Sequence, residues 1–353
     1  MWSRRVAAIS AVGFAGGVAS LSSSASTPAP LRSLPLQKTV PLATTACAPC
    51  RPTCVLVHGL DSSKETFSAT LAELTAAGYP AVAIDLRGHG ESPLGDEAAF
   101  SPAALASDVL AAVHALNPPS GAVLVGHSMG GRVAMRAAAL DAASPTTRVL
   151  HSVVIEDMDV KPRGQAYVKD LNERQTTELA RFGTPDGRRF ASWDAARAAL
   201  LPWYGDERRV DGWKNVRIRQ LPDGSWWSDI NPKAQRLAAK HVLMSEDGQE
   251  AWGELAACAE GARCTLHVWY ADEPGTVVSL DGCEGSIEAM KEVLPGAEYR
   301  IFPGSGHSIH NDKKHAKGFR AALRDVIDAA AREVVASSAQ QQQQQSVKQV
   351  RGG

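Results

Sequence analysis

The sequence has 353 residues, of which 44% are hydrophobic, and it carries a formal net charge of −1. This length and composition allow one large domain with an insertion, or two modest domains, around a sizeable hydrophobic core. The near-zero charge excludes a general electrostatic attraction to nucleic acid or to an anionic membrane surface. We therefore expect no nucleic-acid partner, and no stretch of eighteen or more residues is apolar enough to predict an integral membrane span.

The amino-terminal segment, residues 1–45, has the composition of a targeting and linker segment. The first acidic residue of the chain is Asp61, whereas serine, alanine and arginine are frequent before it. Such an acid-free composition is typical of an organellar transit peptide, so we expect a mitochondrial or chloroplast location. The stretch VAAISAVGFAGGVA, which follows Arg4 and Arg5, resembles the apolar region of a secretory signal and makes secretion the alternative.

The six cysteines are too sparse to form a disulfide framework in a chain of this length. The cluster CAPCRPTC at residues 47–54 lacks a second pair of metal ligands, and Cys54 begins a predicted core strand. We therefore expect reduced thiols and no metal site.

The first half of the predicted core, residues 46–160, alternates apolar strand-like segments with helix-like segments. The strand-like segments are TCVLVHG (53–59), AVAIDLRG (81–88), AVLVGHS (122–128) and HSVVIED (151–157). The helix-like segments are 65–78, 102–116 and 130–142. This alternation predicts a parallel sheet that is covered by helices on both faces.

Residues 161–245 interrupt the alternation and contain five of the eight tryptophans. We interpret them as a helical cap, or lid, inserted into one α/β sheet. The alternation resumes over residues 246–336, with strand-like segments at 264–274 and 297–307 and helix-like segments at 285–296 and 317–335. Residues 337–353, which include the run Gln340 to Gln345, are of low complexity and are predicted to be a disordered tail.

The stretch LVGHSMGGRVA, residues 124–134, indicates a nucleophile. Ser128 lies between a predicted buried strand and a predicted helix, with Gly126 two residues before it and Gly130 two residues after it. Small residues let such a turn close tightly and present the hydroxyl group at its tip. We therefore predict that Ser128 is a nucleophilic serine.

A nucleophilic serine requires a base, and in this chain order the base follows the serine. The stretch FPGSGHSIHND, residues 302–312, follows a late strand, and its glycines form a loop that can carry His307 to the serine. A histidine with an ordinary pKa of about 6.5 can accept the serine proton near neutral pH. His310 is the alternative base, whereas His89 lies too early in the chain and is expected to shape a turn.

The oxyanion formed during acyl transfer requires backbone N–H donors. Met129, which follows the serine, supplies one donor, and Leu60 in LVHGL supplies the other, where a glycine permits a sharp turn at the end of the first strand.

The residues leave the orienting acid open between two aspartates. Asp157 follows the strand after the nucleophile, in VVIEDMD, and Asp272 follows the next strand, in VWYADEP. Their acidic neighbours Glu156, Asp159 and Glu273 are further candidates.

Four motifs, VLVHGL, AIDLRGHGES, VGHSMGG and GSGHSIH, occur in the order typical of the α/β-hydrolase family. Over about residues 50–335 the chain resembles the small acyl-ester esterases of bacteria and their mitochondrial relatives within this family. The resemblance implies an α/β-hydrolase fold with a mostly parallel eight-stranded sheet, a helical lid after the sixth strand, and no cofactor. It also implies Ser128 as nucleophile, His307 as base, and Leu60 and Met129 as oxyanion donors.

The resemblance is weaker at the acid and at the start of the sheet. Many relatives have Gly-x-x-Asp after the seventh strand, but Tyr270 occupies the glycine position here, which aligns Glu273 rather than Asp272. The small-esterase branch resembles this chain in having an aspartate after the sixth strand, so the resemblance favours Asp157. Upstream of Cys54, only LPLQKTVPL (34–42) is available to begin the sheet.

These observations predict a serine hydrolase that cleaves a carboxylic ester or thioester through an acyl-serine intermediate. Its partner is a small-molecule acyl substrate, with the tryptophan-rich cap forming a lid and an apolar acyl pocket. A serine at the elbow argues against haloalkane dehalogenase or epoxide hydrolase chemistry, which uses a carboxylate nucleophile. A carbon–carbon bond hydrolase or lyase with the same triad, and a ligand receptor on a hydrolase scaffold, are the alternatives. The sequence does not fix the oligomeric state.

Overall fold

The computed structural model describes residues 51–144, 148–164, 188–204, 207–215, 217–258, 264–280 and 282–351. These residues all belong to one compact unit, Leu34–Gly353. The predicted targeting segment, the strand expected at 34–42 and part of the predicted cap lie outside the described residues.

The centre of the fold is a parallel sheet whose strands occur in the order β2-β1-β3-β4-β8-β9. The strands are β1 (Thr53–Val57), β2 (Ala81–Ile84), β3 (Ala122–His127), β4 (Leu150–Glu156), β8 (Thr265–Ala271) and β9 (Glu298–Phe302). The predicted parallel sheet is therefore confirmed. Eight strands were expected, and the described part of the chain supplies six to this sheet.

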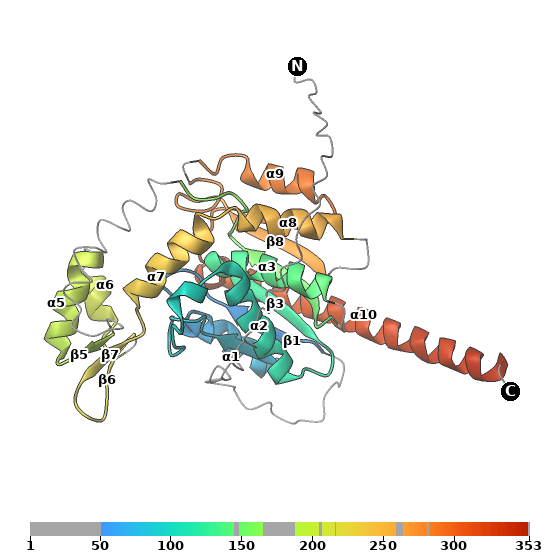
Figure 1. The fold of residues 1–353 in the computed structure, drawn as a ribbon, viewed down its shortest axis with the longest axis horizontal. Coiled ribbons are helices and arrows are strands. Elements are labelled where there is room, and N and C mark those ends of the chain that lie inside the picture. Colours follow the sequence, from blue (N-terminus) through green and yellow to red (C-terminus); the bar gives the residue numbers. More distant parts are fainter. Residues whose placement is uncertain are drawn as a thin grey trace, which may run out of the picture. The chain divides into compact units, whose positions relative to one another are not determined.

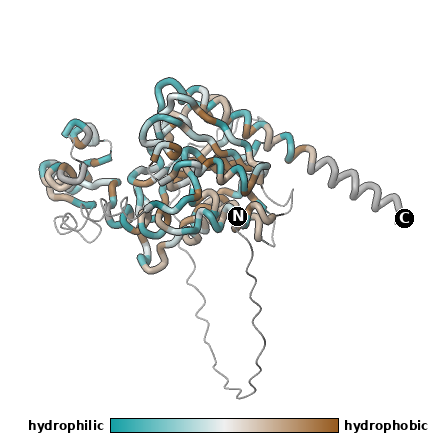
Figure 2. The backbone as a smooth tube through the Cα atoms, turned by 90° about the horizontal axis from the view of Figure 1, so that it is seen from above, coloured by the Kyte–Doolittle hydropathy of each residue, from teal (hydrophilic) through white to brown (hydrophobic). Residues whose placement is uncertain are grey.

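Helices cover both faces of the sheet, as predicted (Figure 1). Val55 and Val57 of β1 belong to a core shared with helices α2, α3, α8 and α9, whereas Cys54 and Leu56 belong to a core shared with α1 and α10. This alternation follows from the two-residue period of a strand. In Figure 2 the hydrophobic segments concentrate inside this α/β core. The helices are α1 (Ser68–Ala76), α2 (Pro102–Leu116), α3 (Met129–Ala143), α8 (Asp247–Ala257), α9 (Ser286–Val293) and α10 (Ala316–Arg351).

The strand order brings the carboxyl ends of β1 and β3 side by side. After β2 the chain returns to the other side of β1, and open α/β sheets bind ligands where the order reverses in this way. The segments that follow β1, β3, β4, β8 and β9 carry the main candidate catalytic residues, which are Leu60, Ser128, Met129, Asp157, Asp272 and His307. Among the described residues, short 3₁₀ helices lie in connecting segments at Lys64–Phe67, Glu97–Ala99 and Ile309–Asn311.

The inserted segment, residues 188–230, contains strands as well as helices. Its elements are β5 (Arg189–Phe190), α5 (Trp193–Tyr204), α6 (Glu207–Gly212), β6 (Ile218–Gln220) and β7 (Trp226–Ser228). The strands pair antiparallel in the order β5-β7-β6. The segment predicted as a helical cap therefore also contains a small antiparallel sheet. The Pro-Asp-Gly sequence before Ser225 forms a tight turn, in which Leu221 N–H donates to Ser225 O at 2.7 Å, and so sets up a hairpin.

The core resumes earlier than the predicted boundary at residue 246. Helix α7 (Pro232–Ala238) continues into a π-helical turn (Ala239–Leu243). Ala238, Val242 and Leu243 are buried in the same core cluster as α3. Their apolar side chains belong to the sheet-covering layer, which corrects the end of the cap.

Helix α10 corrects a second boundary. It continues to Arg351, although residues 337–353 were predicted to be a disordered tail. The sequence from Phe319 to Arg351 contains no glycine or proline, and glutamine is a good helix former, so nothing local ends the helix. Within the described residues, no helix combines the length and the apolar character required to cross a membrane.

Candidate active site

The turn between β3 and α3 holds Ser128 in a strained backbone conformation, with φ 53° and ψ −121°. A Cβ on Gly126 would lie 2.2 Å from Gly130 O, and a Cβ on Gly130 would lie 2.5 Å from Val57 O. Both contacts are with backbone atoms, so neither position accommodates a side chain without displacing the chain. The two glycines thus permit the tight turn that presents the Ser128 hydroxyl.

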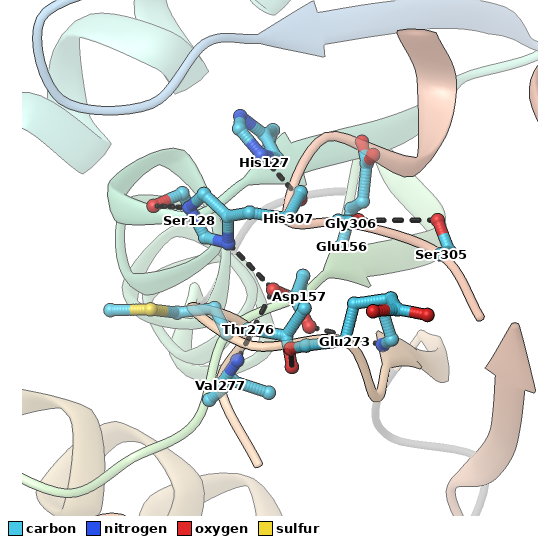
Figure 3. Close-up of polar contacts among 12 residues, drawn as sticks. His127, Ser128, Glu156, Asp157, Glu273, Thr276, Val277, Ser305, Gly306 and His307 are labelled. Carbon is cyan, nitrogen blue, oxygen red and sulfur yellow. Dashed lines mark hydrogen bonds and ion pairs between the residues drawn. The ribbon is translucent and has the colours of Figure 1, made fainter. Parts of the chain in front are cut away.

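Ser128, His307 and Asp157 form one hydrogen-bonded chain (Figure 3). Ser128 Oγ lies 2.9 Å from His307 Nε2, and His307 Nδ1 lies 2.6 Å from Asp157 Oδ2. The imidazole side chain is 40% exposed, whereas the carboxylate is fully buried. A substrate can therefore reach the serine and the imidazole but not the carboxylate.

Asp157 lies immediately after β4 and adopts a positive φ of 45°. Its Oδ1 accepts a hydrogen bond from Ala271 N–H at 3.1 Å, and its Oδ2 accepts one from Val277 N–H at 3.2 Å. Its own N–H donates to Trp269 O at 2.7 Å. These contacts from β8 and the following loop fix the direction in which the carboxylate faces His307.

The other candidate acids make different contacts. Asp272 Oδ1 accepts a hydrogen bond from Gly304 N–H at 2.6 Å, in the loop that carries His307. The side chain of Glu273 is exposed, and its backbone N–H donates to Ser305 O at 3.2 Å. Asp159 forms buried ion pairs with two arginines, Arg132 and Arg163. Asp272 and Glu273 therefore hold the loop, and Asp159 serves a separate cluster.

The two predicted oxyanion donors lie on either side of the elbow. A Cβ on Gly59 would lie 3.0 Å from the Cβ of Ser128, so the segment before Leu60 passes directly beside the serine. Met129 is the first residue of α3, and the first N–H groups of a helix have no partner within that helix. Both N–H groups thus come from segments that meet at Ser128.

The His58 side chain stabilises the turn that leads to Leu60. Its Nδ1–H donates to Gly59 O at 2.8 Å, and its Nε2 accepts from Leu86 N–H at 3.1 Å. Burial lowers the pKa of this imidazole, against the opposing influence of Asp85. A neutral ring is the form that donates from one nitrogen and accepts at the other.

The motif DLRGHGES supports this turn from the neighbouring loop. Asp85 accepts hydrogen bonds from Lys64 N–H at 2.7 Å, from Lys64 Nζ at 2.5 Å and from Glu91 N–H at 2.9 Å. His89 lies in a turn, as predicted, with its N–H donating to Leu86 O at 2.9 Å. Burial lowers the pKa of His89 to about 3, so its ring is neutral.

The inserted segment contacts the same turn through charged residues. Arg217 Nε donates to Asp229 at 2.8 Å, and its Nη2 lies 3.7 Å from Asp61, which follows Leu60. Ser63 Oγ donates to Asp229 at 3.2 Å. The insertion and the segment that carries a predicted oxyanion donor are thus joined by the Arg217–Asp61 ion pair and the Ser63–Asp229 hydrogen bond.

Two residues beside the site were not assigned roles by sequence reasoning. His127 Nε2–H donates to His307 O at 3.0 Å, and burial lowers the pKa of His127 to about 3. Glu156, considered only as an alternative acid, accepts hydrogen bonds from the N–H and the ring of His310. In the sequence, the only indication of a role for His127 and Glu156 was that they directly precede Ser128 and Asp157.

His310, the alternative base, is buried and bonded to Glu156. Burial acts to raise the pKa of the Glu156 carboxyl, but the His310 and His127 imidazoles and the hydrogen bonds from His310 hold it below its usual value. Glu156, His127 and His310 also place one potential metal-ligand atom each within 4.8 Å of one another. Both ring nitrogens of His310, the Glu156 carboxylate and His127 Nε2 are already hydrogen-bonded, whereas His127 Nδ1 is not. We therefore interpret the group as a hydrogen-bonded network.

The chain matches the model of the alpha/beta hydrolase family over residues 54–322. It is similar to the sn-1-specific diacylglycerol lipase ABHD11 of Xenopus laevis, with 39% identity over 298 residues that cover 79% of this chain and 80% of that protein. The protein of the same description from Mus musculus is 36% identical over 276 residues, which cover 74% and 77% of the two chains. Esterase Rv0045c of Mycobacterium tuberculosis is 29% identical over 262 residues, which cover 69% and 83%.

Solved structures share the fold. A marine microorganism esterase superimposes with a TM-score of 0.57 at 18% identity, covering 78% of this chain and 95% of that chain. E-2-(acetamidomethylene)succinate hydrolase superimposes with a TM-score of 0.56 at 22% identity, covering 78% and 91%.

Proposed function

Because the chain belongs to the alpha/beta hydrolase family, we propose that it is a serine hydrolase that cleaves carboxylic esters or thioesters through an acyl-serine intermediate. The observation that carries this proposal is the chain of hydrogen bonds from Ser128 through His307 to the buried Asp157. Its relatives named as esterases and lipases support the same class of reaction.

In the proposed mechanism, Ser128 Oγ attacks the acyl carbon while His307 Nε2 takes the hydroxyl proton. The N–H groups of Leu60 and Met129 stabilise the oxyanion, and the departing alcohol or thiol takes the proton from Nε2. Water then attacks the acyl-serine, with His307 again acting as the base. Asp157 holds Nδ1–H and stabilises the imidazolium that forms.

For the substrate, we propose an acyl ester of lipid type. The support comes from the two relatives described as diacylglycerol lipases. The inserted segment is proposed to act as a lid and to form the acyl pocket. The support is the number of tryptophans in residues 161–245 and the ion pair between Arg217 of the inserted segment and Asp61, which follows Leu60. We also propose an organellar location, on the composition of residues 1–45.

The test uses a panel of p-nitrophenyl esters of increasing acyl length, with Ser128→Ala, His307→Ala and the double variant. Each single variant is expected to lower kcat by a factor of about 10³ or more, and the double variant little further, because the residues act as a unit. A fluorophosphonate probe should label wild-type Ser128 and leave Ser128→Ala unlabelled. Full activity of Ser128→Ala would overturn the mechanism, and a dead His310→Ala beside an active His307→Ala would transfer the role of base.

A further inference from the structure

The histidine loop, residues 303–312, carries His307 and is attached to the core at several points. Near its start, Gly304 N–H donates to Asp272 at 2.6 Å. In its middle, His307 O accepts from His127 Nε2–H at 3.0 Å. Near its end, His310 N–H donates to Glu156 Oε1 at 2.9 Å. The position of the His307 ring therefore depends on anchors on both sides of it.

The anchor at His310 is a second chain of carboxylate, imidazole and hydroxyl. His310 Nδ1 lies 2.8 Å from Glu156 Oε1, and His310 Nε2 lies 3.0 Å from Thr66 Oγ1. Glu156 is the last residue of β4, and Asp157 directly follows it. Successive residues of a strand point to opposite faces, but the positive φ of Asp157 ends the extended conformation, so both carboxylates reach the same loop.

The hydrogen bonds of this second chain assign its protons. The Glu156 carboxylate only accepts, so His310 Nδ1 is the donor. Asn311 Nδ2 donates to Thr66 Oγ1 at 3.2 Å, which leaves the threonine hydroxyl free to donate to His310 Nε2. Every polar atom of the His310 ring is then satisfied with the imidazole neutral. This is the tautomer that His307 requires toward Asp157 and Ser128 in the proposed mechanism.

The second chain is not arranged to act on a substrate. His310 is fully buried, and its ring packs 4.4 Å from the ring of Phe67 and 4.9 Å from the ring of His127, measured between centroids. A base must reach the proton that it transfers, and no substrate reaches a ring enclosed in this way. Its contacts therefore serve the loop.

We propose that Glu156 and His310 are positioning residues that hold His307 at the distance and tautomer required for proton transfer. This inference rests on the proposed function, in which His307 is the base. The physical reason is that the His310 N–H and Nδ1–H share one buried acceptor, so loss of that acceptor leaves two buried donors unsatisfied and releases the end of the loop. A displacement of about 1 Å at a reacting group can cost about 10²-fold in rate.

The kinetic test compares Glu156→Ala, Glu156→Gln, Thr66→Val and Thr66→Ser, with rates expressed per active site titrated with a fluorophosphonate. We expect kcat to fall by about 10- to 100-fold in Glu156→Ala and less in Glu156→Gln, which keeps an acceptor oxygen, with KM nearly unchanged. Thr66→Val should lower kcat and Thr66→Ser should restore it, because serine retains the hydroxyl. Glu292→Gln, on an exposed face of α9, controls for the loss of one carboxylate.

A spectroscopic test does not depend on any substrate. Ring N–H protons held by buried carboxylates resonate far downfield, so ¹H NMR should show one from His307 and one from His310. Asp157→Ala and Glu156→Ala assign them, because each variant removes the acceptor of one ring N–H. We expect Thr66→Val or Glu156→Gln also to shift or broaden the His307 resonance.

The two tests separate the possible failures. An unchanged kcat per titrated site in Glu156→Ala, or an unaltered His307 resonance in both Glu156→Gln and Thr66→Val, would overturn the positioning role. Absence of ester hydrolysis by the wild type would instead overturn the proposed function, and the resonances would still decide whether Glu156 and His310 position the His307 ring.

Discussion

The backbone around Ser128 depends on residues that have no side chain. Gly130 lies where the first turn of α3 approaches the end of β1, and a Cβ there would meet two carbonyl oxygens, those of Val57 and His58, at 2.5 Å and 2.6 Å. Backbone atoms cannot move aside as the end of a flexible side chain can. The glycines that flank Ser128 thus reflect close packing between β1, β3 and α3, in addition to the chemistry of the serine.

We predict that Gly130→Ala destabilises the protein by roughly 1–3 kcal/mol or more, because the methyl group forces the elbow away from β1. Gly253→Ala in α8 is the matched control. A Cβ at Gly253 meets nothing within 4 Å, and alanine favours a helix over glycine by about 1 kcal/mol. Urea denaturation of both variants checks this, and an equally stable Gly130→Ala would contradict the close approach.

The two aspartates left open by the sequence should respond very differently to substitution. Asp157→Asn should lower kcat by roughly 10³- to 10⁴-fold, because the amide no longer holds the His307 tautomer that accepts the serine proton. Asp272→Asn should have a mild effect, because its remaining oxygen can still accept the Gly304 N–H. Ester kinetics on both variants, with circular dichroism as the control for folding, decides between them. A nearly normal Asp157→Asn beside a dead Asp272→Asn would reverse the assignment.

At the scale of elements, α10 continues well beyond the core contacts that are described for its first half. Phe319, Leu323 and Ile327 bury its first half against the sheet. Nucleation is the costly step in helix formation, and once a turn exists each further residue adds a hydrogen bond at little cost. The alanine- and glutamine-rich second half of α10 can therefore extend as a helix from the first half, which is already held by packing against the sheet.

Deletion of residues 337–353 should leave folding and ester hydrolysis intact, because the described core contacts of α10, the last of which is at Ala330, precede residue 337. Far-UV circular dichroism should show the loss of about fifteen helical residues, which correspond to positions 337–351 of α10. An unchanged helical signal would show that these residues are not helical in solution and would restore the prediction of a disordered tail.

At the scale of the whole molecule, buried histidines link stability to pH. Burial lowers the pKa of His89 and His127 to about 3 and also lowers that of His58. The unfolded chain takes up these protons near pH 6.5, whereas the folded chain stays neutral until a much lower pH. Their contribution to stability is therefore fully present above about pH 6.5 and is lost as the pH falls.

We predict that the free energy of unfolding is lower at pH 5.5 than at pH 7.5, by up to about 1.4 kcal/mol per histidine and pH unit below 6.5. The carboxyls of Asp85 and Glu156, whose pKa values are lowered, act in the same direction but below about pH 4.5. Urea titrations at the two pH values check the slope, and His89→Gln should flatten it. Equal stability at both pH values would show that the rings take up protons in the folded state.

The sequence alone determined the parallel sheet with two helical layers. Buried parallel strands read as apolar runs and the helices between them as alanine-rich segments, and both are local patterns. The glycine-flanked Ser128 and the glycine-rich segment around His307 could also be read locally, because tight turns restrict which residues are allowed. The distance between Ser128 and His307 could not be read from the local sequence, because it depends on the order of β3 and β9 in the sheet.

Only the tertiary structure decided which carboxylate meets His307, because Asp157 and Asp272 both follow strands and differ only in how their loops turn. It also decided that the inserted segment contains a small sheet and that Glu156 accepts from His310. These features depend on contacts between residues that are far apart in the chain. Side-chain direction at the end of β4 depends on the positive φ of Asp157, a conformation that aspartate adopts only occasionally, so the residue type alone does not specify it.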